Sequence, residues 1–189
     1  KGPLSILTLN RPEKLNALNM EMIRMMAANV ARGLRDDDIK AFIFKGAGER
    51  AFCAGGDIVS TYYAGMDFRK GNISLDVATL FFGEEYSLNR KLFHLSKPSI
   101  ALMKGITMGG GYGIAGNTKY PVACAETIFA MPETRIGFFV DIGAMYHLNQ
   151  IPSKALGRYL AMTGENLYGR NVYDAGLASH FIPSDQFNV

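Results

Sequence analysis

Short apolar runs divide the first two thirds of the chain and predict buried strands. Leu4 to Leu9 alternates apolar and polar positions, and Ala41 to Phe44 is a continuous apolar run that ends at Gly46-Ala47-Gly48. Runs of this length, bounded by turn residues, are typical of strands in a core. The other segments predicted as short strands are Ala51 to Cys53, Ser99 to Met103, Val122 to Cys124, Thr127 to Phe129 and His180 to Ile182.

Between these runs, apolar residues spaced by about four predict helices. An apolar stripe from Met22 to Leu34 follows Asn19, whose side chain can cap a helix that begins at Met20. The other predicted helices are a long one from about Leu75 to Leu95, one near Ala144 to Leu148, one capped by Ser153 through Met162 and stopped by Gly164, and a short one capped by Asn171 and reaching Leu177.

The predicted strand Ser99 to Met103 leads into three consecutive glycines, Gly109 to Gly111, where a helix of small residues begins. Glycines leave the backbone bare, so a ligand can touch it directly. The N–H groups at a helix start have no intrahelical partner and favour negative charge. The stretch can therefore hold an anion, or an oxygen that becomes one. A tight turn that packs a strand closely against a helix explains the same glycines.

A second glycine motif follows the run Ala51 to Cys53 and reads Gly55-Gly56-Asp57, with a helix expected after it. Cys53 is better explained as a small buried residue than as a nucleophile. A reactive thiolate needs electropositive surroundings, and its neighbours in sequence are Phe52 and Ala54.

Acidic residues in apolar surroundings are the next candidates for chemistry. Glu133 and Asp141 lie in the apolar, glycine-punctuated segment from Met131 to Gly143. Desolvation would raise the pKa of either carboxyl group toward neutrality, which suits proton transfer. Alternatively, Glu133 caps a turn and Asp141 caps the helix that follows. Glu84 and Glu85 are adjacent on a predicted helix, so at most one of them faces a given site.

Composition narrows the class of protein. The chain has 189 residues, enough for one domain with a substantial core, and 48% of them are hydrophobic. The net charge of +3 is scattered without a basic run, so no nucleic-acid surface is predicted. Two cysteines make no disulfide framework, which fits a reducing compartment. No apolar run approaches the roughly 20 residues that span a bilayer. The sequence starts at Lys1, so any signal segment is expected to have been removed or never present, and both ends are expected to be cut.

Several common motifs are absent or incomplete. Gly111 to Gly116 matches G-x-G-x-x-G, but Tyr120-Pro121 ends the following helix too early for a dinucleotide-binding unit. No G-x-S-x-G elbow and no Walker sequence is present. His94, His147 and His180 are isolated and lack paired metal-ligand spacing, so no metal site is predicted.

Three of these segments resemble the crotonase, or enoyl-CoA hydratase/isomerase, superfamily: Asn10 to Leu18, Ala51 to Ile58 and Gly109 to Gly111. The resemblance extends from Leu4 to Ile182. It implies an α/β (α+β) fold in which β-β-α turns form a spiral with two roughly perpendicular sheets flanked by helices, here as a single core domain over residues 1–189. It also implies a homo-trimer or a pair of trimers, and chains that continue past residue 189 with C-terminal helices that this chain is expected to lack.

The resemblance also implies roles for individual residues. Backbone N–H groups of Gly56 and Gly110 would bind the thioester oxygen, as an oxyanion hole does. Of the two glutamates that hydratases use, the second corresponds to Glu133 and the first to Gly113, which has no side chain. Residues expected along the path of the substrate are Glu85, as an additional acid in contact with the substrate, and Lys14, Leu15, Ala17, Ala54, Asp57 and Ile58, beside coenzyme A.

Glycine at the hydratase acid position favours the hydrolase branch of the superfamily. The segments Phe82 to Tyr86, Gly105 to Gly111 and Phe129 to Thr134 resemble that branch, whereas Val140 stands where it usually has a proline before Asp141. The catalytic carboxylates would then be Glu133 and Asp141.

The function that the resemblance implies is hydrolysis of a short 3-hydroxyacyl-CoA, such as 3-hydroxyisobutyryl-CoA in valine breakdown. No metal or redox cofactor is implied, and coenzyme A enters as part of the substrate. Neither a nucleic acid nor a membrane is expected as a partner. The expected location is the mitochondrial matrix in a eukaryote or the cytoplasm in a bacterium. Two alternatives stay open: another crotonase activity, such as hydration or isomerisation, and a non-catalytic component of the mitochondrial ribosome.

Overall fold

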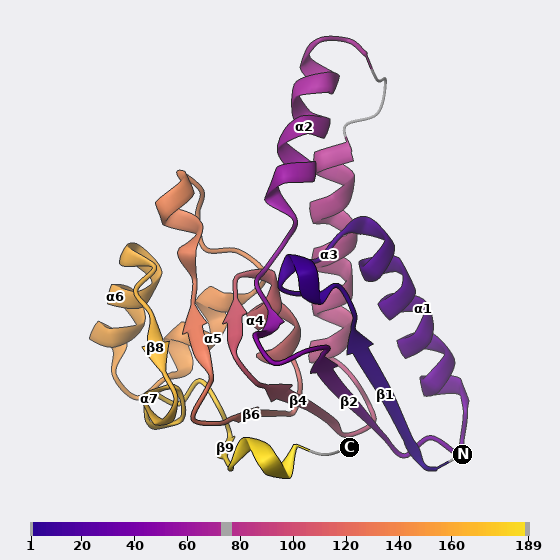
Figure 1. Cartoon of the computed structure of the whole chain (residues 1–189), viewed down its shortest axis with the longest axis vertical. Helices are drawn as coiled ribbons and strands as arrows, with labels where there is room; N and C mark the ends of the chain where they lie inside the picture. The colour runs from indigo at the N-terminus through magenta and orange to yellow at the C-terminus, as the bar shows by residue number, and fades with distance from the viewer. Residues whose placement is uncertain (1, 73–76, 188–189) are drawn as a thin grey trace.

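The computed structural model describes residues 2–72 and 77–187, and its strands form two sheets (Figure 1). The strands of the five-stranded sheet, in spatial order, are β1 (Leu4–Leu9), β2 (Ala41–Gly46), β4 (Ser99–Met103), β6 (Tyr120–Ala123) and β9 (His180–Phe181). The strands of the four-stranded sheet are β3 (Ala51–Cys53), β5 (Ile106–Met108), β7 (Ile128–Ala130) and β8 (Leu167–Tyr168). All neighbouring strands are parallel except β7 and β8.

The two sheets grow together as the chain advances. Each of the consecutive pairs β2–β3, β4–β5 and β6–β7 gives its first strand to the larger sheet and its second strand to the smaller one. Because each new strand pairs in parallel with the one from the previous turn, the chain winds as a spiral of β-β units. This architecture confirms the mixed α/β fold with two helix-flanked sheets that the sequence predicts.

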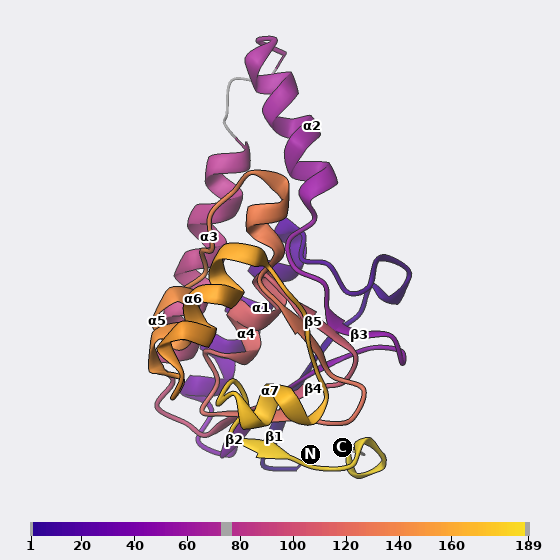
Figure 2. The ribbon, with the colours of Figure 1, turned by 90° about the vertical axis from the view of Figure 1, so that its left-hand side faces the viewer.

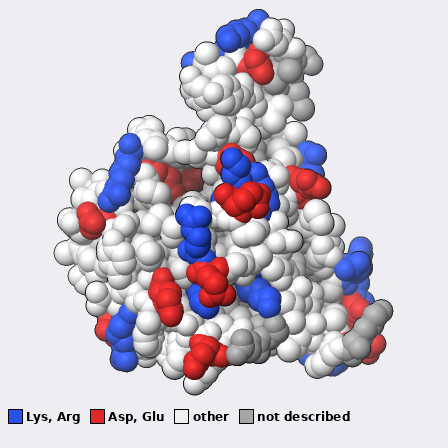
Figure 3. Space-filling view, in the orientation of Figure 1, with Lys and Arg blue, Asp and Glu red and all other residues white. Residues whose placement is uncertain are grey.

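Helices cover the sheets and form one projection. The helices are α1 (Met20–Arg35), α2 (Ile58–Arg69), α3 (Val77–Phe93), α4 (Gly110–Ala115), α5 (Ala144–Gln150), α6 (Lys154–Thr163) and α7 (Arg170–Asp174). In Figures 1 and 2, α2 and the start of α3 extend away from the rest of the molecule, whereas the remainder of α3 packs beside α1 and α4. On the face in Figure 3, acidic and basic side chains are interspersed, and no broad area of one charge is present.

The core between the layers is aromatic and aliphatic. Phe42, Phe44, Phe52 and Phe129 are fully buried and belong to strands of both sheets. The predicted cap of α1 is confirmed, because the side chain of Asn19 accepts a hydrogen bond from the N–H of Met22 at 2.9 Å. Within the described part of the chain, no helix has both the length and the apolar character that crossing a bilayer requires.

The sequence missed two strands and misplaced the ends of one helix. Strands β5 and β8 were not predicted. Two residues are too few for β8 to show a period in sequence, and β5 lies among the glycines from Gly105 to Gly111, which indicate a turn. The short helix predicted from Asn171 to Leu177 is present as α7, but its predicted cap and its predicted end are wrong. Gly169, with a φ of 50°, precedes α7, so Asn171 lies inside a helix that ends at Asp174. The predicted start of the long helix at Leu75 lies outside the described residues, which begin again at Val77.

Candidate active site

A cavity of about 940 Å³ lies where the ends of β3, β5 and β7 meet α2 and α3. The predicted site residues that line it are Lys14, Ala17, Ala54, Gly56, Asp57, Ile58, Glu85, Gly110, Glu133 and Asp141. Leu15 does not line the cavity. Its contact with the cavity wall is through the main chain, because its carbonyl accepts a hydrogen bond from the N–H of the wall residue Ala54 at 3.0 Å.

Two backbone segments approach each other closely at the floor of this cavity. Gly56 follows β3, and Gly110 is the first residue of α4, directly after β5. A Cβ atom on Gly110 would lie 3.3 Å from the nitrogen of Gly56. As the first residue of α4, Gly110 has no intrahelical acceptor for its N–H. The N–H of Gly56 is not used in the bridge to Leu18, which pairs the carbonyl of Gly55 and the N–H of Asp57.

Three carboxyl groups from separate elements meet beside these glycines. Glu85 comes from α3, Glu133 from the 3-10 turn Pro132–Ile136, and Asp141 from the loop before α5. A Cβ atom on Gly110 would be 2.4 Å from Oε1 of Glu85, and one on Gly109 would be 2.8 Å from Oε1 of Glu133. A methyl group at either position would push a carboxyl group out of place, and at Gly109 the φ of 47° favours glycine in addition.

These carboxyl groups are desolvated, and their pKa values are raised. Burial, followed by the charges of Asp141 and Glu133, raises the pKa of Glu85 to about 8. Burial and the charge of Asp141 raise the pKa of Glu133 to about 7, and burial also raises the pKa of Asp141. The upward shifts expected from sequence for Glu133 and Asp141 are confirmed. At neutral pH Glu85 is mostly protonated and can donate a hydrogen bond, whereas Glu133 can exchange a proton.

Glu85 and Glu133 also have unsatisfied oxygens. Within the described residues, Oε1 of Glu85 and Oε2 of Glu133 are buried and have no hydrogen-bond partner. Buried polar atoms are normally paired, so such orphans indicate a place for a ligand or an ordered water. The neighbouring Glu84 faces outward instead, and its oxygens accept two hydrogen bonds from Arg24 at 2.8 and 2.6 Å. The prediction that at most one of the two adjacent glutamates faces the site is therefore confirmed.

Asp141 is held by a residue that the sequence did not single out. The hydroxyl of Tyr86, on α3, donates to Oδ2 of Asp141 at 2.6 Å. The alternative that Asp141 caps α5 is wrong, since the N-cap is Gly143 and no side-chain cap is made. Tyr86 directly follows Glu85, and only the fold shows that it turns toward Asp141. Asp141 and Ile142 also line a second, largely apolar cavity of about 550 Å³ beside α5.

Replacing Tyr86 with phenylalanine should raise the pKa of Asp141 further. The hydrogen bond from Tyr86 favours the ionised carboxylate and opposes the desolvation that raises the pKa. Without the hydroxyl, the desolvation is no longer opposed by this hydrogen bond, so the group ionises at higher pH. A ¹³C NMR titration of the aspartate carboxyl carbons measures the change, with the exposed Tyr159→Phe as control. An unchanged or lower pKa in Tyr86→Phe would contradict the assigned contact.

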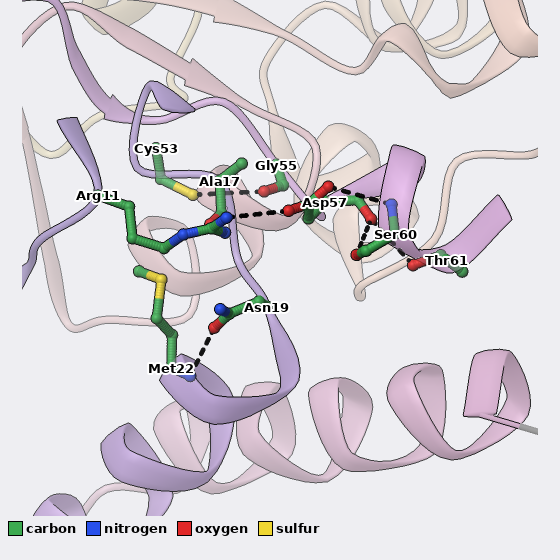
Figure 4. A network of polar contacts seen from close by, with 9 residues as sticks. All are labelled: Arg11, Ala17, Asn19, Met22, Cys53, Gly55, Asp57, Ser60 and Thr61. Atoms are coloured by element: carbon green, nitrogen blue, oxygen red, sulfur yellow. Dashed lines mark hydrogen bonds and ion pairs between the residues drawn. The ribbon is translucent and has the colours of Figure 1, made fainter. Parts of the chain in front are cut away.

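A polar network orders the mouth of the cavity (Figure 4). Asp57 caps α2 by accepting from the N–H of Ser60 at 3.3 Å, and it pairs with Nη2 of Arg11 at 3.1 Å. Arg11 also donates to the carbonyl of Ala17 at 2.7 Å. Although desolvation opposes it, hydrogen bonds from Ser60 and Arg11 hold the pKa of Asp57 below its ordinary value. The network ties the N-terminal loop, which carries Lys14 and Ala17, to the start of α2.

Cys53 is structural, as the sequence predicts. It is fully buried, and desolvation raises the pKa of its thiol to about 12, so it stays protonated. Its Sγ points to the carbonyl of Gly55, 3.7 Å away. No group of three or more His, Cys, Asp or Glu side chains in the described ranges has an arrangement that could hold a metal ion.

The fold and this arrangement of glycines and acids define the class of protein. The family model for enoyl-CoA hydratase/isomerase matches residues 4–189, and the chain belongs to that family. A crystal structure titled as a carnitinyl-CoA dehydratase from Mycobacterium thermoresistibile superposes with a TM-score of 0.91 at 36% identity, over 100% of this chain and 53% of that one. An enoyl-CoA hydratase from Rhodobacter sphaeroides gives 0.86 at 30% identity, over 97% of this chain and 52% of the other.

Relatives with curated names narrow the comparison within the family. A mitochondrial 3-hydroxyisobutyryl-CoA hydrolase of Danio rerio is 45% identical over 185 residues, which are 98% of this chain and 47% of the relative. The protein of the same name from Dictyostelium discoideum is 42% identical over 191 residues, covering 100% of this chain and 50% of the relative. The chain thus spans about half the length of the curated relatives it matches.

Proposed function

We propose that the protein hydrolyses a short 3-hydroxyacyl-CoA thioester, with 3-hydroxyisobutyryl-CoA as the preferred substrate. The observation that carries this proposal is the buried Glu133, whose pKa is raised to about 7. It shares the cavity with Gly56 and Gly110, which present bare backbone. The relatives named 3-hydroxyisobutyryl-CoA hydrolase, at 42–45% identity, support the choice of substrate. The role in valine breakdown follows from that substrate.

In the proposed mechanism, the thioester oxygen accepts hydrogen bonds from the N–H groups of Gly56 and Gly110. Glu133 takes a proton from water, whose oxygen forms a bond to the carbonyl carbon while the carbonyl electrons move onto oxygen. The carbon–sulfur bond then breaks as the carbonyl re-forms, and the coenzyme A thiolate takes the proton from Glu133. Alternatively, the Glu133 carboxylate attacks the carbonyl carbon and expels the thiolate, and water then hydrolyses the resulting anhydride.

The other acids have roles in holding the hydroxyacyl group. Asp141 orients this group or passes on a proton, while Glu85, protonated at neutral pH, contacts the substrate hydroxyl. The wall residues that would lie along coenzyme A are Lys14, Ala17, Ala54, Asp57 and Ile58. We propose that no metal or redox cofactor takes part, so exhaustive dialysis against a chelator should leave the rate unchanged.

Hydration or dehydration of an enoyl-CoA is the second candidate, favoured by the 36% identity to the carnitinyl-CoA dehydratase. The packing around Gly113 opposes it. A Cβ atom there would lie 2.8 Å from Cδ1 of Ile142 and 3.2 Å from Nδ2 of Asn89. The space that a hydratase glutamate at this position would need is therefore filled by neighbouring side chains.

We expect the protein to hydrate crotonyl-CoA poorly, because no carboxylate projects from position 113. Thiol release over a panel of acyl-CoA esters measures hydrolysis, and loss of absorbance from the conjugated enoyl group measures hydration. Rapid release of coenzyme A from 3-hydroxyisobutyryl-CoA with slow hydration of crotonyl-CoA supports the hydrolase. The reverse pattern would replace it with the second candidate.

We also propose a homo-trimer or a pair of trimers, located in the mitochondrial matrix in a eukaryote or in the cytoplasm in a bacterium. The names of the hydrolase relatives, which include the word mitochondrial, support the first location. Light scattering after size exclusion measures the number of chains in the assembly.

Co-sedimentation of the native protein with mitochondrial ribosomes, together with no thiol release from any ester, would favour the non-catalytic role.

A further inference from the structure

The turn that follows Asp141 has a backbone conformation that its sequence does not favour. The carbonyl of Asp141 accepts from the N–H of Ala144 at 2.8 Å, with Ile142 and Gly143 between them at φ values of 51° and 79°. Two central residues with positive φ are typical of a type I′ turn, which asparagine and glycine prefer. A β-branched residue such as Ile142 persists there only when its surroundings enforce the conformation.

One buried amide makes the contacts that can enforce this turn. Asn117, which is 7% exposed, donates from Nδ2 to the carbonyl of Gly113 at 2.7 Å and to the carbonyl of Ile142 at 3.4 Å. Gly113 belongs to α4, the helix that begins at Gly110. A single side chain therefore links the helix that carries the proposed oxyanion donor to the turn that aims Asp141.

The orientation of this amide is set from the other side by a histidine. Because Nδ2 of Asn117 faces two carbonyls, Oδ1 is the atom left to pair with Nε2 of His147 on α5, 3.1 Å away. Oδ1 only accepts, so Nε2 of His147 must carry a proton. Desolvation lowers the pKa of His147, which favours the neutral ring, and the contact with Oδ1 then places its single proton on Nε2. This ring and that of Tyr112 on α4 also make a T-shaped contact, with their centroids 5.8 Å apart.

We propose that Asn117, oriented by His147, is a positioning residue that locks the Asp141 turn to α4 and so fixes the carboxylate relative to the oxyanion donor. This inference rests on the proposed function for its kinetic consequence, but its structural part stands on the contacts alone. Loss of the amide frees the carbonyl of Ile142, lets the turn relax to negative φ and moves Asp141 away from Tyr86. A shift of about 1 Å at a reacting group can lower turnover by up to about a hundredfold without weakening binding.

The kinetic test compares matched variants on 3-hydroxyisobutyryl-CoA. Asn117→Asp keeps the shape and removes the N–H donor, so kcat should fall at least about tenfold while KM changes less than about twofold. His147→Phe should lower kcat, and His147→Gln, which retains an N–H, should restore most of it. Asn149→Ala, an exposed asparagine on α5, is the control and should match the parent. Parent-like turnover in Asn117→Asp would overturn the proposal.

A second measurement does not depend on catalysis. ¹⁵N NMR of the three histidines should show His147 as the Nε2–H tautomer in the parent, and a changed tautomer or shift in Asn117→Asp. A crystal structure of that variant should show Ile142 at negative φ and the contact between Asp141 and Tyr86 broken. An Nδ1–H tautomer in the parent, or an unchanged turn in the variant, would overturn the positioning role. If the parent chain cleaves no ester, the proposed hydrolase function is wrong. The tautomer of His147 and the conformation of the turn still show whether Asn117 positions Asp141.

Discussion

Glu133→Gln should abolish most thioester hydrolysis while leaving affinity for the acyl-CoA nearly unchanged. The amide has the shape of the carboxyl group but can neither take a proton from water nor attack the carbonyl carbon. General acid–base catalysis by one side chain contributes about 10²–10⁴-fold, and turnover should fall by an amount in this range. Binding depends on contacts along the whole coenzyme A path, so the dissociation constant should change little. Single-turnover kinetics and calorimetry measure the two quantities separately.

The control for this variant is Glu165→Gln. This exposed glutamate lies outside the cavity, pairs with Arg135 at 3.7 Å and accepts a hydrogen bond from the N–H of Asn166 at 3.2 Å. Asp141→Asn should also lower turnover, more for hydroxylated than for plain acyl chains. The double variant of Glu133 and Asp141 should lose less than the product of the single losses, because both groups serve one step. Near-native hydrolysis by Glu133→Gln would end the proposed mechanism. Equal losses on both kinds of acyl chain would remove the orienting role of Asp141.

Gly110→Pro should lower turnover by at least about a hundredfold. Proline lacks the N–H that is proposed to bind the oxyanion, and removal of one such donor lowers kcat by about 10²–10³-fold in related chemistry. Because Gly110 is the first residue of α4, proline there suits the helix. The ring would nonetheless press on Glu85, whose Oε1 is 2.4 Å from the Cβ position. Steady-state hydrolysis of 3-hydroxyisobutyryl-CoA, with circular dichroism to confirm folding, measures the effect.

Two further glycine variants separate the lost donor from the added bulk. Gly110→Ala keeps the N–H. It displaces Glu85 and presses lightly on Gly56 and Leu18, each 3.3 Å from the added methyl group, so it should retain more activity than Gly110→Pro. Gly83→Ala, on the exposed side of α3 with no atom within 4 Å of the added methyl group, should leave activity intact and stabilise the helix by about 0.5–1 kcal/mol. A folded Gly110→Pro with most of its activity would mean that the donor lies elsewhere.

Much of the fold follows from sequence because its signals are local. Asn19 and Ser153 were predicted as helix caps, and both accept the expected backbone hydrogen bond, at 2.9 and 3.2 Å. Capping depends on residues within one turn of the helix, so the sequence contains all the necessary information. Strand β8, by contrast, has two residues and exists because it pairs with β7, almost 40 positions earlier in the chain. No local pattern encodes such a pairing.

The sequence likewise predicts one part of the candidate site, whereas the other part appears only in the structure. Glycines and acids in apolar surroundings were visible in sequence, and the structure brings Gly56, Gly110, Glu133 and Asp141 to one cavity. The contacts that set the properties of these groups join distant segments, such as the hydrogen bond from Tyr86 to Asp141 across 55 positions. Leu15 was assigned to the cavity by its place in a motif, but it is not among the residues that line the cavity. Motif position identifies a segment, whereas the fold decides which of its side chains reach the cavity.

The spiral places Gly56, Gly110 and Glu133 just beyond the ends of β3, β5 and β7, three neighbouring strands of one sheet. Adjacent strands are about 4.8 Å apart, and two N–H groups at that separation, each about 2.9 Å from a shared oxygen, subtend about 110° at it. This angle is close to that between the two lone pairs of a carbonyl oxygen. The spacing of the strands would therefore set the width of the proposed oxyanion hole through the main chain. That width would not depend on which side chains surround the substrate.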